Sequence, residues 1–125
     1  FGEANLQGDN GCSGYFRVDW FTPDGLRTWG DGRTMILGTE GYIELRKYID
    51  VARETSGNHL YLVNSEREYH LDLNGKVGYP FFGKLVLDCL NRTETAMTQE
   101  HAFKAAELCL KAQELADTKR LSSLQ

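Results

Sequence analysis

The residues best suited to ligand binding lie in and next to the loop at positions 22–32. The loop is long for a connection between two strands, and long loops are often functional. Trp29, Asp31 and Arg33 stand close together at its end. An aromatic ring beside a carboxylate and a guanidinium can bind a sugar by stacking and hydrogen bonding. In the alternative, structural interpretation, Trp29 packs on the edge of the core and Asp31 pairs only with Arg33.

The rest of the chain shows no spacing that predicts catalysis or metal binding. His59, His70 and His101 are isolated from one another in the sequence, and no His-x-x-His pair exists. The glycines around positions 8–14 and 30–32 match neither phosphate-binding pattern that joins a strand to a helix, so we assign them to turns. We therefore expect no catalytic, cofactor-binding or metal-binding residue in this chain.

Composition narrows the class of protein. The chain has 125 residues, with 14 Lys and Arg against 18 Asp and Glu, and a net charge of −4. A nucleic-acid-binding surface needs a basic excess, so we expect no nucleic-acid partner. No apolar run approaches the ~20 residues of a membrane span, and no signal peptide is recognisable. Cys12, Cys89 and Cys109 have long spacings and are expected to be buried, reduced thiols of a cytoplasmic protein.

Strict alternation of apolar and polar residues predicts three pairs of antiparallel strands. The first pair comprises residues 3–7 and 14–21, on either side of a Gly-Asp-Asn-Gly turn. The second pair lies within residues 33–45, and the third comprises residues 59–63 and 68–73. Together these segments predict a mainly antiparallel open sheet.

Two of the connecting turns can be predicted from residue types. Gly38 and Gly41 bracket the reversal within residues 33–45 and are expected to adopt positive φ angles. The sequence Thr-Pro-Asp-Gly at residues 22–25 predicts a type I turn with Pro23 at its second position.

Beyond Gly78 the apolar residues follow a helical period. Pro80 suits the first turn of a helix that Asn91 ends in a left-handed conformation, and Thr98 caps a second helix. The first helix carries an apolar stripe at Phe82, Leu85, Val86, Cys89 and Leu90. Strands followed by helices predict an α+β domain over residues 1–125, with the two helices packed on one face of the sheet.

The opposite face of the sheet has an unusual composition. If the alternation holds, it presents Tyr15, Arg17, Asp19, Tyr42, Glu44 and Arg46. Tyrosine and arginine are enriched in interfaces, which favours a subunit interface or a ligand surface. The alternative is a solvated face, which is common in antiparallel sheets.

Two segments carry a resemblance to a known family. Residues 14–45 contain the turn Gly-Thr-Glu-Gly-Tyr-Ile-Glu, and residues 81–116 contain a terminal helix that begins Gln-Glu-His. Their order and spacing resemble the C-terminal domain of Gfo/Idh/MocA oxidoreductases, the relatives of glucose–fructose oxidoreductase and inositol dehydrogenase. The resemblance covers nearly the whole chain.

The resemblance implies a two-domain parent enzyme. An N-terminal Rossmann domain would bind NAD or NADP, and the C-terminal α+β domain would bound the substrate site and build a homo-oligomer through its open sheet. The implied reaction is hydride transfer from a sugar, cyclitol or related polyol to the nicotinamide. The loop with Trp29, Asp31 and Arg33 would lie on the substrate side.

The chain departs from the family in what it lacks. It contains no dinucleotide fingerprint, no Glu-Lys-Pro segment with the family's catalytic lysine, and no Asp-x-x-x-His segment with the catalytic histidine. We therefore expect a chain that begins inside the second domain and is inactive alone. Two other interpretations are a self-standing dimerisation module and a carbohydrate-binding module that uses Trp20 and Trp29.

Overall fold

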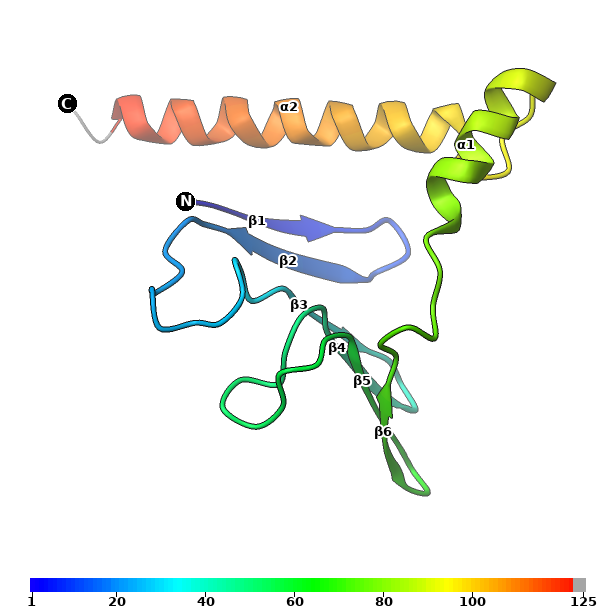
Figure 1. The fold of residues 1–125 in the computed structure, drawn as a ribbon. Helices are drawn as coiled ribbons and strands as arrows, with labels where there is room; N and C mark the ends of the chain where they lie inside the picture. Colours follow the sequence, from blue (N-terminus) through cyan, green and yellow to red (C-terminus); the bar gives the residue numbers. More distant parts are fainter. Residues whose placement is uncertain (123–125) are drawn as a thin grey trace. The chain divides into compact units, whose positions relative to one another are not determined.

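The strands and the helices fall into two compact units. The computed structural model describes residues 1–122, with side chains through residue 119. One unit, Phe1–Gly78, holds the six strands, and the other, Tyr79–Gln125, holds the two helices (Figure 1). The predicted α+β class, with antiparallel strands first and helices last, is confirmed. The packing of the helices on one face of the sheet stays a prediction.

The first two strands form a ribbon of their own. Strands β1 (Gly2–Gln7) and β2 (Ser13–Val18) pair antiparallel, and the Gly8 amide donates to the Cys12 carbonyl at 2.8 Å to close the turn. Strand β2 ends three residues earlier than the alternation predicts. The Asp19 carboxylate accepts the Phe21 amide at 3.0 Å, and this local bond offers the backbone an alternative to sheet pairing.

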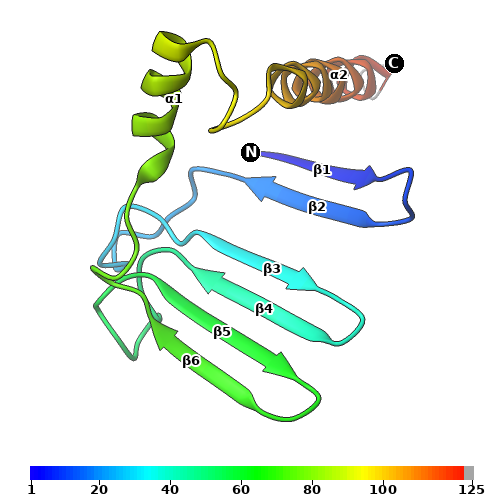
Figure 2. The same ribbon diagram turned by 90° about the vertical axis from the view of Figure 1, so that its right-hand side faces the viewer.

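The other four strands form an antiparallel meander. Its strands follow the chain order, β3 (Arg33–Leu37), β4 (Gly41–Arg46), β5 (His59–Asn64) and β6 (Glu68–Asp72), as Figure 2 shows. No hydrogen-bonded pairing joins β2 to β3 among the described strands, so the strands are divided between two sheets.

The strand register divides the four-stranded sheet into two chemically different faces. The polar face presents Arg33, Met35, Leu37, Tyr42, Glu44, Arg46, His59, Tyr61, Val63, Glu68, His70 and Asp72. The apolar face presents Thr34, Ile36, Ile43, Leu45, Leu60, Leu62, Tyr69 and Leu71. The register agrees with the alternation along β4, since Tyr42, Glu44 and Arg46 lie on one face and Ile43 and Leu45 lie on the other.

The turn between β3 and β4 depends on one glycine rather than two. Gly41 has a φ of 157°, and a Cβ built on it would lie 2.1 Å from the Val63 carbonyl oxygen on β5. Gly38 is not among the residues with positive φ, so that part of the prediction is wrong. Its amide instead donates to the Gly41 carbonyl at 2.8 Å, which requires no special backbone angle.

The loop after β2 contains a turn one residue later than predicted. The Leu26 amide donates to the Pro23 carbonyl at 3.0 Å, so Pro23 occupies the first position of the turn and not the second. The loop then reaches β3 through Gly32, whose carbonyl accepts the Lys47 amide at 2.9 Å.

Little apolar side-chain area is buried within the described residues. Ile49, on the segment after β4, is the buried hydrophobic residue there, at 6% exposure. The predicted burial of Cys12, Cys89 and Cys109 is wrong, because all three thiols are free and exposed. Cys12 lies in the tight turn of the β1–β2 ribbon, where its carbonyl accepts the Gly8 amide and its thiol is exposed.

The second unit contains helices α1 (Pro80–Asn91) and α2 (Gln99–Ser122). Pro80 begins α1 as predicted, but Arg92 and not Asn91 takes the left-handed position, with a φ of 59°. The predicted cap of α2 is confirmed, since the Thr98 hydroxyl accepts the His101 amide at 3.2 Å. Among the described residues, neither helix has the length and apolarity needed to cross a membrane.

Candidate functional site

Two exposed tryptophans stand together beside the loop after β2. The indole rings of Trp20 and Trp29 have centroids 5.1 Å apart and planes at 72°, and each residue is 79% exposed. The structural interpretation expected Trp29 to pack on the edge of the core, and its exposure shows that it does not. The two rings form an open corner with most of their area accessible to a ligand.

Two ion pairs accompany the tryptophans. The Arg17 Nε donates to the Asp19 carboxylate at 2.9 Å, and Arg33 donates to Asp31 from Nε at 3.1 Å and from Nη2 at 2.7 Å. The hydrogen bond with Asp31 raises the pKa of Arg33. The Phe21 amide, followed by the charge and hydrogen bond of Arg17, lowers the pKa of Asp19. Both shifts favour the charged forms of Arg33 and Asp19.

These residues line one open groove of about 1090 Å³ within the first unit. Its lining includes Trp20, Trp29 and both ion pairs, together with Phe21 and Tyr48. The predicted set Trp29, Asp31 and Arg33 is therefore brought together at one surface. The sequence analysis did not assign Arg17 and Asp19 to this site. They precede the loop, and the path of the loop brings Asp31 and Arg33 back to the same groove.

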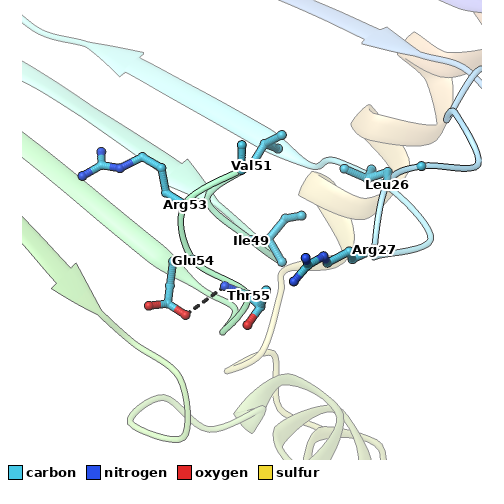
Figure 3. Close-up of a pocket in the computed structure, with 9 residues that line it drawn as sticks. Leu26, Arg27, Ile49, Val51, Arg53, Glu54 and Thr55 are labelled. Atoms are coloured by element: carbon cyan, nitrogen blue, oxygen red, sulfur yellow. Dashed lines mark hydrogen bonds between the residues drawn. The ribbon is translucent and has the colours of Figure 1, made fainter.

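A smaller cavity of about 340 Å³ lies between the same loop and the segment after β4 (Figure 3). Leu26 and Arg27 come from the loop, and Ile49, Val51 and Thr55 come from the segment that follows β4. The lining combines aliphatic side chains with the polar side chains of Arg27, Arg53, Glu54 and Thr55. It lies where the loop after β2 comes close to the segment between β4 and β5.

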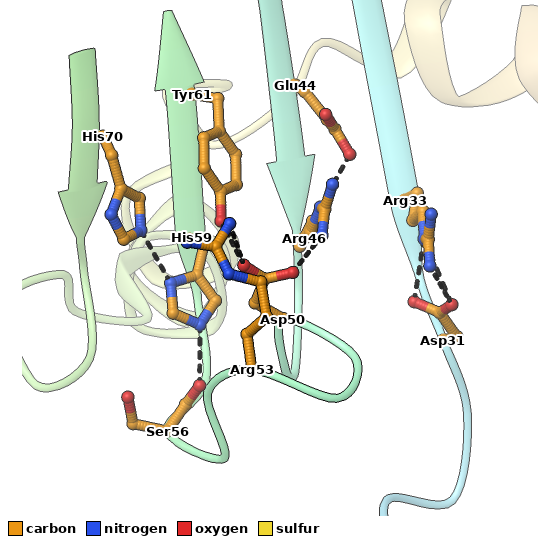
Figure 4. Close-up of polar contacts among 10 residues, drawn as sticks. All are labelled: Asp31, Arg33, Glu44, Arg46, Asp50, Arg53, Ser56, His59, Tyr61 and His70. Carbon is orange, nitrogen blue, oxygen red and sulfur yellow. Dashed lines mark hydrogen bonds and ion pairs between the residues drawn. The ribbon is translucent and has the colours of Figure 1, made fainter. Parts of the chain in front are cut away.

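The polar face carries a network of charged side chains centred on Asp50 (Figure 4). Asp50 is 5% exposed and accepts hydrogen bonds from Arg46 and, at 2.9 Å, from the Tyr61 hydroxyl. Arg46 also donates to Glu44 at 2.7 Å, and Arg53 lies 3.6 Å from Asp50. A buried carboxylate needs such partners to remain charged.

The network shifts the titration of its members. Burial opposes ionisation of Asp50, but the Tyr61 hydrogen bond and the charges of Arg46 and Arg53 outweigh it, so the pKa of Asp50 is lowered. Burial and the bond to Asp50 raise the pKa of Tyr61. The hydrogen bond to Glu44 raises the pKa of Arg46. All three shifts favour the protonation states that these hydrogen bonds require, a charged Asp50, a charged Arg46 and a neutral Tyr61.

Two histidines that the sequence analysis treated as isolated are in contact. His59 Nδ1 lies 3.0 Å from His70 Nε2, and His59 Nε2 lies 2.8 Å from the Ser56 carbonyl oxygen. His59 is 1% exposed, whereas His70 lies at the surface. Their diagonal positions on β5 and β6 were the signal that could have found this pair, since His59 pairs with Asp72, His70 pairs with Tyr61, and all fall on the polar face.

The six predicted interface residues are divided between the two sheets. Tyr42, Glu44 and Arg46 lie on the polar face of β4, while Tyr15 and Arg17 lie on β2 and Asp19 follows it. Tyr15 donates to Glu3 at 3.0 Å across the β1–β2 ribbon. Asp19 belongs to the groove as well.

The chain was compared with family models, curated proteins and solved structures. No family model matches the chain, and no curated protein matches it. The fold is similar to the crystal structure of a protein described as a "putative oxidoreductase from Erwinia carotovora atroseptica SCRI1043", with a TM-score of 0.83 and 56% sequence identity. The match covers 90% of this chain. This chain thus resembles part of an oxidoreductase.

The chain spans about a third of the Erwinia protein, since the match covers 33% of it. The remaining two-thirds of that protein have no counterpart in this chain.

Proposed function

We propose that this chain is the C-terminal part of an NAD- or NADP-dependent oxidoreductase of the Gfo/Idh/MocA type, acting on a sugar, cyclitol or similar polyol. The observation that carries the proposal is the 56% identity to one third of the Erwinia protein. The sequence resemblance to that family's C-terminal domain supports it independently. The chain by itself would be inactive.

The nicotinamide cofactor does not fit the residues of this chain. A dinucleotide site is built where a strand meets a helix in a strand–helix–strand unit. In residues 1–122 all six strands precede both helices, and neighbouring strands are antiparallel. We therefore assign cofactor binding to the part of the parent enzyme outside this chain, and we derive no step of hydride transfer here.

The part that this chain plays would be to shape the substrate side and the subunit contacts. The loop with Trp29, Asp31 and Arg33 would form a wall of the substrate site, because it combines an exposed ring with fixed hydrogen-bonding groups. The polar face with Tyr42, Glu44 and Arg46 would contact a second copy of the enzyme in a homo-oligomer.

A chimera tests the proposal. The matched third of the Erwinia protein is replaced by this chain, and NADH and NADPH are titrated while nicotinamide fluorescence is followed. We expect the chimera to bind one of the two cofactors and residues 1–125 alone to bind neither.

Two results would overturn the proposal. One is cofactor binding by residues 1–125 alone, which requires a site that the fold does not offer. The other is a chimera that fails to fold or binds neither cofactor, because at 56% identity the contacts with the rest of the Erwinia protein should be kept.

A further inference from the structure

We propose that β2 and β3 are the two sides of an open slot in one sheet, and that a single extended segment of polypeptide pairs with both strands at once. The segment comes from the two-thirds of the parent enzyme that this chain does not match. Its source rests on the proposed function above, whereas the slot belongs to this chain alone. The partner is therefore a β-strand.

The hydrogen-bond pattern shows which backbone groups of β3 are free. The Lys47 amide donates to the carbonyl of Gly32, the residue before β3, so Gly32 and every second residue after it face β4. The residues between them turn their N–H and C=O groups to the opposite side. The backbone groups that point away from β4 belong to Arg33, Met35 and Leu37.

The same pattern leaves one edge of β2 free. The Gly8 amide donates to the Cys12 carbonyl, so Cys12 and every second residue after it face β1. The backbone groups that point away from β1 belong to Ser13, Tyr15 and Arg17. In the part of the chain that the structure describes, no strand pairs with the free edge of β2 or of β3.

The two free edges lie next to each other. Both views show β2 beside β3, and Figure 2 shows them running in opposite directions. The open groove is lined by Val18 at the end of β2 and by Arg33 at the start of β3, so one end of the slot is open. Residues 19–32 join the two strands, whereas residues 38–40 suffice between β3 and β4. The longer loop can pass around the end of a strand that lies between them.

The two edges of the four-stranded sheet differ in composition. Exposed edge strands usually carry charged residues or prolines, which prevent pairing with other chains. The outer edge, β6, follows this rule with Glu68 and Asp72. Largely exposed apolar residues follow one another on β3: Met35 at 66%, Ile36 at 53% and Leu37 at 81%. We expect an edge of this kind to be covered by another strand.

The neighbouring side chains indicate the composition of the inserted strand. Met35 and Leu37 lie on the polar face of β3 and Ile36 lies on the apolar face, while β2 contributes Phe16 and Val18. A strand with apolar neighbours on both faces needs apolar residues at most positions. Its length should match the five residues of β3 and the six of β2. Only an extended backbone presents donors and acceptors to both sides.

Amide hydrogen exchange in residues 1–125 and in the chimera with the Erwinia protein tests the proposal. In residues 1–125 alone, we expect fast exchange at Tyr15, Arg17, Met35 and Leu37. In the chimera these amides should be protected by about a hundredfold or more, because each gains a backbone partner. His70 is the internal control, since its backbone points outward on β6 and should exchange fast in both proteins.

A proline removes one N–H group from the slot. Met35→Pro takes away an amide that points away from β4, so residues 1–125 should keep their circular dichroism spectrum. In the chimera the same substitution should reduce protection at Arg17 and Leu37 by about tenfold or more. Glu68→Pro changes an outward position on β6 and is the matched control. If Met35→Pro unfolds residues 1–125, Tyr15→Pro on the other side of the slot replaces it.

A second measurement does not depend on the chimera. Overlapping synthetic peptides that cover the unmatched two-thirds of the Erwinia protein are added one at a time to residues 1–125. We expect one peptide, rich in apolar residues, to bind saturably and to protect the outward amides of β2 and β3. Its binding should be lost in Met35→Pro and retained in Glu68→Pro.

Three results would overturn the inference: fast exchange at the outward amides of β2 and β3 in a folded chimera, no binding by any peptide where the chimera does not fold, or protection in residues 1–125 alone that rises with concentration. The last result would make a second copy the occupant. A chimera that binds a nicotinamide cofactor while these amides exchange fast would remove this inference and leave the proposed function standing. Protected amides in a chimera that binds no cofactor would do the reverse.

Discussion

Asp88 organises the connection between the two helices. Its carboxylate is 6% exposed and accepts hydrogen bonds from the Thr93 hydroxyl at 2.6 Å, the Thr95 amide at 2.9 Å and the Ala96 amide at 2.8 Å. Asp88→Asn replaces one acceptor oxygen with a donor, so at least one of these amides loses its partner. We expect amide hydrogen exchange at Thr95 and Ala96 to accelerate by about tenfold or more.

The same contacts predict a pH dependence. The Thr93 hydroxyl and the Ala96 and Thr95 amides hold the pKa of Asp88 well below its ordinary value of 3.8. A lowered pKa contributes stability above the ordinary value, and this contribution is lost as the pH falls below it. Protection at Ala96 should therefore decrease below about pH 4 in the unmodified chain but not in Asp88→Asn. Asp117→Asn, an exposed position on α2, is the control and should retain the acid-dependent loss.

The contact between His59 and His70 fixes two tautomers. The Ser56 carbonyl only accepts, so His59 Nε2 must carry a hydrogen, and in the neutral pair His59 Nδ1 accepts from His70 Nε2. Two-bond nitrogen–proton NMR correlations should show the hydrogen on Nε2 of both rings in the neutral pair. His70→Ala should destabilise the unit by ~0.5–1.5 kcal/mol. A His59 ring protonated on Nδ1 alone would contradict the assignment.

Individual strands and helices follow local rules, and these were predictable. Apolar and polar residues alternate along β4 and β5, while α1 begins at a proline and α2 follows a threonine cap. The errors fall where a side chain or a neighbouring strand overrides the local pattern. Asp19 ended β2 early by bonding to the backbone. The positive φ predicted for Gly41 is confirmed, but the close approach of a β5 carbonyl to this residue is a contact that no local pattern could indicate.

The β3–β4 turn provides a matched pair of substitutions at the scale of one hairpin. Gly41→Ala places a Cβ 2.1 Å from the Val63 carbonyl oxygen, so β4 and β5 must separate or shift. Gly38→Ala meets its nearest atom at 3.5 Å, an ordinary contact. We expect Gly41→Ala to lower the free energy of unfolding of the first unit by more than about 2 kcal/mol, and Gly38→Ala to change it much less. Urea denaturation measures both, and equal effects would contradict the close approach.

The candidate site was only partly predictable because it depends on contacts between distant segments. Trp29, Asp31 and Arg33 were close in sequence, and their shared loop identified them. Trp20 and the Arg17–Asp19 pair joined them only through the path of the loop. The cavity beside the loop likewise depends on Ile49 and Val51, which come from a segment after β4.

At the scale of the whole molecule, the proposed homo-oligomer depends on which face of the four-stranded sheet meets a second copy. On the polar face, Leu37 and Met35 are 81% and 66% exposed, and Tyr42 lies opposite Leu37. Leu37→Lys would bury a charge in an interface on this face and should weaken association by about tenfold or more. Ile36→Lys changes the neighbouring residue, which lies on the apolar face, and it is the matched control.

Sedimentation velocity on residues 1–125 and on the chimera measures association for both variants. We expect Leu37→Lys to shift each protein toward the monomer and Ile36→Lys to shift it much less, because their side chains lie on opposite faces of β3. If Ile36→Lys dissociates the oligomer and Leu37→Lys does not, the interface lies on the apolar face instead. If the unsubstituted chimera is a monomer at every concentration, the proposed homo-oligomer is contradicted. Association through a self-complementary interface must increase with protein concentration.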